Sequence, residues 1–267
     1  MRTKKFGFTL AEGATHVGLL PTNAKAGFTL AEVLITLGII GVVAAVTMPS
    51  LISNIQDRQH RAKWKTVYSQ INNAFNKVYF ENQDTYGNGV EGTGWWNTQF
   101  VGQMMSQFEV LDKCGTPPKS LLLDMPQCNF RQKHKWNALS NNHSIYKTLA
   151  GGSLNAYDFM DFSYLLKNGA SIYFGGSHSG PTILVDVNNA SAGPNVLGRD
   201  VFGIHCGPNT ACTKLVPMGA VDTYHPNTVY NYNGKVVGAC SKDIGTVDTN
   251  YIYTASGAGC AAKYLME

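Results

Sequence analysis

The sequence has few charged residues and lacks the common catalytic signatures. Asp, Glu, Lys and Arg together make up 14% of 267 residues. No Gly-x-Ser-x-Gly elbow, phosphate-binding loop or His-Glu-x-x-His motif occurs in it. A glycine-rich stretch at 175–180 places a serine beside a histidine, but this pattern is typical of a loop. We therefore expect no enzyme, and we assign none of the seven histidines a role.

Excess charge of either sign is also lacking outside the N-terminus. The net charge is +4, and residues 1–27 supply most of it through four basic residues against one Glu. The other 240 residues carry 17 basic and 16 acidic side chains. A basic cluster at 131–135 is typical of a solvated loop. We expect no nucleic-acid partner, because such proteins usually present a broad basic surface.

What the sequence does contain is one long uncharged run between Glu32 and Asp57. Its 24 residues would form about 36 Å of helix, enough to cross a hydrocarbon core of about 30 Å. Gly38, Gly41 and Pro49 interrupt the run, and membrane helices tolerate such residues. A secretory signal peptide is the alternative, but the run exceeds the usual length and no clear cleavage site follows it.

A single carboxylate, that of Glu32, lies at the start of this run. A charge at membrane depth costs about 2.5–3.5 kcal/mol on insertion scales, so it indicates a function. The residues before it are Gly27-Phe28-Thr29-Leu30-Ala31. A basic leader ending in Gly, then Phe-Thr-Leu-x-Glu and an apolar helix, resembles the class III signal of type IV pilins and type II secretion pseudopilins. The resemblance covers about the first 55 residues.

The resemblance implies a role for each matching residue. Residues 1–27 would be a leader that a prepilin peptidase removes after Gly27, and the same enzyme would methylate the new amine of Phe28. Glu32 would pair with the Phe28 amine of a neighbouring subunit during filament assembly, and Pro49 would kink the helix. The implied partners are the peptidase, an inner-membrane assembly platform and other pilin or pseudopilin subunits.

The N-terminal motif occurs twice. Residues 6–12 repeat it 20 positions upstream. Residues 13–26 follow that copy, and they contain Gly, Pro and Lys and cannot form an apolar span. We therefore predict cleavage after Gly27, with cleavage after Gly7 as the alternative. The basic leader then lies in the cytoplasm and the C-terminal part outside, in agreement with the positive-inside rule.

Six cysteines lie in the part predicted to be exported, which favours disulfides. Six cysteines allow 15 connectivities. We expect neighbours in the sequence to pair, because short loops close most easily. A zinc site at His205, Cys206 and Cys212 is the alternative, but no Cys-x-x-Cys pair occurs and the spacing suits no common zinc module. The expected pairs are Cys114–Cys128, Cys206–Cys212 and Cys240–Cys260.

The rest of the chain predicts an α+β, pilin-like fold. Residues 28–83 are expected to form one long helix, with its transmembrane half at about 28–52. Its second half carries an apolar stripe at positions 55, 62, 64, 67, 71, 75 and 78. Residues 84–267 are expected to form a disulfide-containing domain whose antiparallel sheet packs on this stripe. Expected strands are 171–174, 182–187, 201–204, 228–232, 235–237 and 251–254, with short helices at 99–111 and 136–149.

One loop in this domain has residues that could bind calcium. Asp186, Asn188 and Asp200 could supply oxygen ligands, as in the comparable loop of major pseudopilins. A complete Asp-x-Asp-x-Asp-Gly loop is missing, and Asx turns use the same residue types without an ion. We favour a structural turn and expect no other cofactor.

Two functions remain open from the sequence. The first is a structural subunit, minor rather than major, of a type IV pilus or a type II secretion pseudopilus. It would wait in the inner membrane as a single-pass protein and end in a filament in the periplasm or at the cell surface. The second is a ligand-binding or adhesion protein that uses the filament as its carrier.

Overall fold

The structure is a computed structural model. It describes residues 27–87, 96–114, 146–154, 162–177, 180–189, 192–207, 212–220, 230–232, 235–237, 240–241 and 255–267. The chain divides into two compact units, Met1–Ser50 and Leu51–Glu267. The expected boundary between helix and domain at residue 83 stays a prediction.

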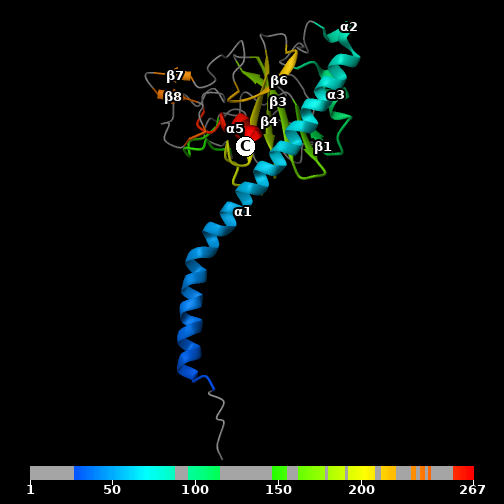
Figure 1. Ribbon diagram of the computed structural model, residues 1–267. Helices are drawn as coiled ribbons and strands as arrows, with labels where there is room; N and C mark the ends of the chain where they lie inside the picture. The colour runs from blue at the N-terminus through cyan, green and yellow to red at the C-terminus, as the bar shows by residue number, and fades with distance from the viewer. Residues whose placement is uncertain are drawn as a thin grey trace, which may run out of the picture. The chain divides into compact units, whose positions relative to one another are not determined.

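Helix α1 (Leu30–Glu81) has 52 residues and is by far the longest element that the structure describes (Figure 1). From Trp64 onward the predicted stripe is correct, because Trp64, Val67, Ile71, Phe75 and Val78 are buried. At its beginning the stripe was placed wrongly. The side chain of Ile55 is 47% exposed, that of Ala62 is also exposed, and the buried residue in this turn is His60. At about 100° per residue, Ile55 and Ala62 lie roughly 180° and 160° around the helix from Trp64, on the side that faces away from the core.

The C-terminal part contains a six-stranded antiparallel sheet in the order β1-β2-β3-β4-β5-β6, and a separate hairpin of β7 and β8. Each strand of the large sheet pairs with the next one in sequence. The described elements after α1 are α2 (Gln83–Tyr86), α3 (Thr98–Met105), β1 (Val110–Cys114), β2 (Phe162–Leu166), β3 (Ser171–Ser177), β4 (Gly180–Asp186), β5 (Val201–Gly207), β6 (Lys214–Pro217), β7 (Tyr230–Tyr232), β8 (Lys235–Val237) and α5 (Cys260–Met266).

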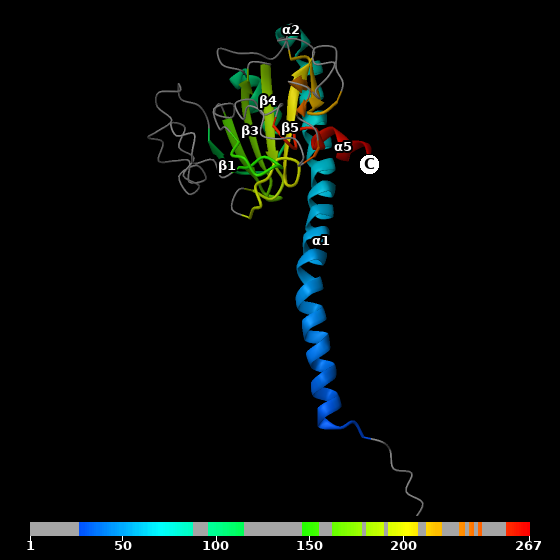
Figure 2. The ribbon, with the colours of Figure 1, turned by 90° about the vertical axis from the view of Figure 1, so that its left-hand side faces the viewer.

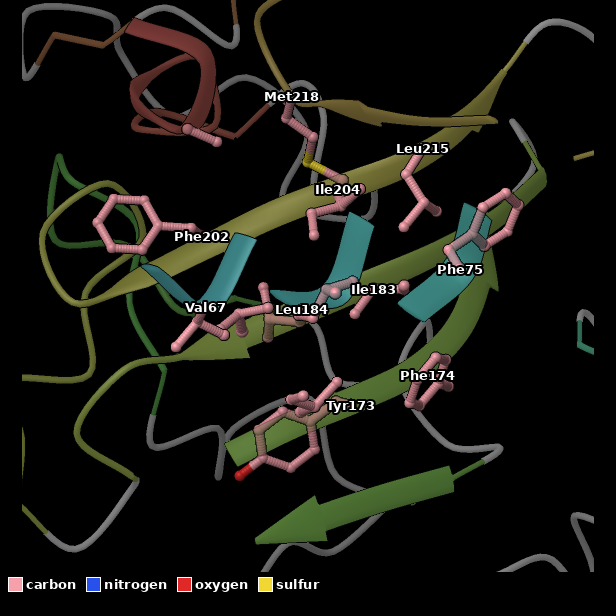
Figure 3. Packing of buried hydrophobic residues seen from close by; sticks show 14 of the residues in the cluster. Val67, Phe75, Tyr173, Phe174, Ile183, Leu184, Phe202, Ile204, Leu215 and Met218 are labelled. Carbon is pink, nitrogen blue, oxygen red and sulfur yellow. The ribbon is translucent and has the colours of Figure 1, made fainter. Parts of the chain in front are cut away.

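The core lies between the second half of α1 and the sheet. Val67 and Phe75 of α1 lie over the face of the sheet that carries Ile183 of β4 and its partner Ile204 of β5, and all four side chains are buried (Figure 3). The Trp64 ring stacks on Phe202 of β5 with their centroids 4.8 Å apart. Helix α5 lies against α1, as Figure 2 shows, with Trp64 Nε1 donating to the carbonyl of Ala261 at 2.9 Å. The prediction of a long helix packed on an antiparallel sheet is confirmed.

Several predicted elements differ in detail. The strands expected at 171–174, 182–187, 201–204, 228–232 and 235–237 correspond to β3, β4, β5, β7 and β8, whereas β1, β2, β6 and α5 were not predicted. The helix expected at 99–111 ends at Met105, because Val110 already pairs with Leu166 in the sheet. Residues 146–149 form a bridge and a turn instead of helix. Residues 136–145 and 251–254 lie outside the described residues.

Candidate functional site

The N-terminus of α1 is closed by a capping box. Thr29 precedes the first helical residue, Leu30, and its Oγ1 accepts a hydrogen bond from the Glu32 N–H at 3.2 Å. The Glu32 carboxylate in turn accepts from both the N–H and the hydroxyl of Thr29, each at 2.8 Å. Ser or Thr at the cap with Glu three residues later satisfies helix N–H groups that have no partner within the helix. The carboxylate also lies at the positive end of the helix dipole, which stabilises it further.

The predicted site residues Gly27, Phe28 and Glu32 are all accessible here. All three are exposed, and the Phe28 side chain is 87% exposed. Thus the peptide bond between Gly27 and Phe28 lies one residue before the cap and outside the helix. An acidic residue at the start of an apolar run draws attention to Glu32 but not to Thr29, although the Thr-x-x-Glu spacing predicts the capping box.

The apolar segment that follows suits a lipid environment. Among the described residues, α1 is the one helix long and apolar enough to cross a membrane, with a mean hydropathy of 2.3 in its most apolar window and none of that window buried. Its hydroxyl groups are satisfied within the helix: Thr47 donates to the carbonyl of Val43, and Ser50 to that of Thr47, both at 2.9 Å. Internal satisfaction of polar groups is required where water is absent.

Pro49 lies inside α1, and the helix continues through it. Proline has no N–H, so the carbonyl four residues earlier receives no helix hydrogen bond from this position. The expected kink at Pro49 stays a prediction.

Beyond the apolar segment, α1 is fastened to the domain by charged contacts. Arg199, in the turn before β5, donates from Nε to Asp57 Oδ1 and from Nη2 to Ser53 Oγ, both at 2.7 Å. Arg61 lies over the ring of Tyr264 in α5, 4.0 Å from its centroid, and donates to Glu267 at 3.2 Å. These partners are more than 140 residues apart in sequence, so a local sequence pattern could not reveal them.

Two carboxylates are fully buried beneath this contact. Asp186, at the end of β4, accepts a hydrogen bond from the Tyr146 hydroxyl at 2.9 Å and one from the backbone N–H of Asn188 at 3.2 Å. Asp200 accepts from the backbone N–H groups of Asn195 and Val196 at 2.8 and 2.7 Å. Burial and, to a lesser extent, the nearby Asp200 charge raise the pKa of Asp186 to about 7. Burial also raises the pKa of Asp200.

These hydrogen bonds are those of a structural turn. Asn188, the third residue considered for calcium, donates from its side-chain amide to the carbonyl of Gly193. In the described part of the chain, no group of three or more His, Cys, Asp or Glu side chains is arranged to hold a metal ion. Calcium binding by Asp186, Asn188 and Asp200, the alternative to the favoured structural turn, stays untested.

The cysteine pairing agrees with the sequence prediction where the structure describes it. Cys206 forms a disulfide with Cys212 and Cys240 with Cys260, with Cα atoms 4.6 and 4.5 Å apart. The first bridge joins the end of β5 to the segment before β6, and the second ties residue 240 to the start of α5. The pair Cys114–Cys128 lies outside the described residues, apart from the backbone of Cys114 in β1.

A groove of about 470 Å³ lies between α1, the segment 107–109 and the turn that joins β2 to β3. Four of its side chains carry amides, and the half-buried ring of Phe108 forms part of its wall. The groove is therefore a candidate surface for a ligand with many hydroxyl groups. The amide residues are Gln70, Asn73, Gln107 and Asn168.

Comparison with known proteins gives a match in the N-terminal region. Residues 22–48 match the family described as the prokaryotic N-terminal methylation motif. Neither curated proteins nor solved structures give a match to this chain. The matched residues contain the predicted cleavage position, the capping box and most of the exposed apolar helix. The chain therefore carries the class III prepilin signal of type IV pilins and pseudopilins, on an α+β fold of pilin-like architecture.

Proposed function

We propose that this protein is a structural, non-catalytic subunit of a type IV pilus or type II secretion pseudopilus, and a minor one. The observation that carries the proposal is the methylation motif at 22–48, whose carboxylate lies at the start of an exposed apolar helix. The pilin-like fold and its two described disulfides agree with a domain outside the cytoplasm.

The first step is removal of the leader. A prepilin peptidase hydrolyses the peptide bond between Gly27 and Phe28, and the absence of a side chain at Gly27 suits a narrow pocket in that enzyme. The new amine of Phe28 is then methylated. The capping box involves Thr29 and Glu32 alone, so this cleavage leaves the start of the helix intact.

The second step is assembly. Until then the subunit lies in the inner membrane with its domain outside, anchored by the apolar half of α1. In the filament, Glu32 pairs with the positive amine of Phe28 from a neighbouring subunit. Removing one partner of a buried ion pair costs about 3–5 kcal/mol, enough to fix the register between subunits. Thr29 holds the carboxylate in position before the partner arrives.

Two substitutions separate the charge of Glu32 from its capping role. Glu32→Val removes both, whereas Glu32→Gln keeps an oxygen that can accept from Thr29 and removes only the charge. We expect both variants to be processed after Gly27 and neither to assemble, as measured by N-terminal mass and by the amount of subunit in sheared filaments. Efficient assembly of Glu32→Gln would show that capping suffices and would contradict the pairing mechanism.

A filament-borne ligand-binding or adhesion protein is the second candidate, and the amide-lined groove favours it. Planar amides beside an aromatic ring suit a glycan. Retention of filaments on immobilised glycans, lost on substitution of Gln107 and Asn168 by Ala, would support this function over a purely structural one.

A further inference from the structure

A pocket of about 300 Å³ lies where α1 meets the turn before β5 and helix α5. One wall is formed by α1 and another by Arg199 and its neighbour in the turn. Leu149 and the ring of Tyr264 provide apolar surface. The lining residues are Ser53, Asp57, Arg61, Leu149, Gly198, Arg199 and Tyr264.

Two guanidinium groups line this pocket, and Arg199 has N–H donors that its contacts with α1 do not use. Its Nε and Nη2 bond to Asp57 and Ser53. Its remaining N–H groups make no hydrogen bond to any residue that the structure describes. Arg61 is 40% exposed and bonds to Glu267 through Nη1. Asp57, itself 33% exposed, lines the pocket and pairs with Arg199, and Glu267, 46% exposed, pairs with Arg61. A bound phosphate would therefore take over donors from these two partly exposed carboxylates.

The pocket's place in the sequence points to its ligand. The uncharged run begins at Val33 and ends at Gln56, so Ser53 and Asp57 flank its end. If α1 is a membrane anchor, as proposed above, these residues lie among lipid headgroups. Arginine binds phosphate through two parallel N–H donors and is only weakly hydrated, which suits a site at a membrane surface.

We propose that this pocket binds the phosphodiester of an anionic phospholipid while the subunit waits in the membrane. Arg199 and Arg61 donate to the phosphate oxygens, and Leu149 and Tyr264 cover the glycerol. Asp57 competes with the phosphate for Arg199. This competition keeps the binding weak and reversible, so the subunit can leave the membrane when it is assembled.

The test uses the full, uncut chain in neutral detergent, with bound lipid counted by native mass spectrometry. Phosphatidylglycerol should be retained in preference to phosphatidylcholine. Arg199→Gln and Arg61→Gln should each lower its affinity about fivefold, the effect of one basic residue near a lipid surface. Asp57→Asn should raise the affinity by a similar factor, because it removes the competing carboxylate. Arg58→Gln is the matched control, since Arg58 is exposed on the same helix and does not line the pocket.

Opposite changes in the Arg199 and Asp57 variants would support the proposal, and thermal unfolding would confirm that each variant is folded. Equal retention of both lipids, or an equal loss in Arg58→Gln, would overturn it. Competition by millimolar inorganic phosphate as strong as that by the lipid would also overturn it, because the site would then take any phosphate. The assay needs no peptidase. Failure of lipid binding therefore leaves the processing proposal standing, and failure of processing leaves the lipid result valid.

Discussion

Asp186 is predicted to make the stability of the domain depend on pH. Its carboxyl group is fully buried, hydrogen-bonded to the Tyr146 hydroxyl and close to Asp200. The Tyr173 hydroxyl lies 2.9 Å from the Tyr146 hydroxyl and shares a hydrogen bond with it, and burial raises the pKa of Tyr146 well above its usual value. No cation contacts Asp186 among the described residues. The substitution Asp186→Asn removes the ionisable group while keeping its size.

The sign of the effect follows from the direction of the pKa shift. The pKa of Asp186 rises from 3.8 to about 7 in the folded protein, so the folded state holds a proton that the unfolded state has lost between these pH values. The contribution of Asp186 to the free energy of unfolding is therefore greatest below pH 4 and decreases as the pH rises to 7. About three pKa units at 1.36 kcal/mol each correspond to roughly 4 kcal/mol. Asp200 acts in the same direction, because burial raises its pKa too.

His60 acts in the opposite direction. Burial is the main cause that lowers its pKa below 6.5, although the charges of Asp200 and Asp57 raise it in part. The folded state therefore binds this proton less readily than the unfolded state. The contribution of His60 to the free energy of unfolding is greatest above pH 6.5 and decreases as the pH falls below it. His60→Gln should accordingly steepen the decline in stability between pH 5 and 8 that Asp186 causes.

The assay is urea unfolding of the full chain in neutral detergent, followed by tryptophan fluorescence at pH 5 and pH 8. Wild type should be the more stable at pH 5. Asp186→Asn should lose most of this difference, with a cost at pH 5 of about 1–3 kcal/mol because the new amide faces the Asn188 N–H. The same pH dependence in wild type and Asp186→Asn would refute the reasoning, since Asp186 would then be ionised throughout.

Three further predictions concern the packing of α1, the disulfide at the start of α5 and the cap of α1. Trp64→Phe leaves the carbonyl of Ala261 without its donor and should lower the free energy of unfolding by about 1–3 kcal/mol; an unchanged urea midpoint would contradict it. Replacing Cys240 and Cys260 together by Ala removes a disulfide that spans 20 residues and should lower the free energy of unfolding by about 3 kcal/mol. A reductant should then lower the stability of the variant less than that of wild type, because this disulfide is already absent. Thr29→Val removes the capping hydroxyl and should reduce helix content near the N-terminus in detergent, by a capping free energy of about 1 kcal/mol. Amide exchange there as slow as in wild type would exclude the capping role.

Local patterns in the sequence were enough to predict the long helix and much of its buried face. Trp64, Val67 and Ile71 recur at helical spacing, and each is buried in the structure. The same periodicity could not show where the globular contact begins, so Ile55 was assigned to the core wrongly. His60 is buried there instead. A search for apolar residues at helical spacing does not find a histidine, so its burial could not be predicted in this way.

The motif around the predicted processing site could be recognised from the sequence, whereas the three-dimensional contacts of the domain could not. The Gly27-Phe28 junction and Glu32 are adjacent in sequence, so their pattern is specific. Arg199 meets α1 only because β4 and β5 bring their connecting turn to that helix, and no local spacing encodes this. Strand β2 was missed because its burial depends on pairing with β1 and β3 more than on alternation of polar and apolar residues.

The most direct test of the account is the N-terminus of the mature protein. The full chain would be co-expressed with a prepilin peptidase and analysed by intact mass and N-terminal sequencing, with Gly27→Val as the control that cannot be cut. The account predicts a chain that begins at methylated Phe28 and lacks residues 1–27, and an uncut control. An uncut wild-type chain, a chain cut after Gly7, or one cut beyond the apolar run would contradict it.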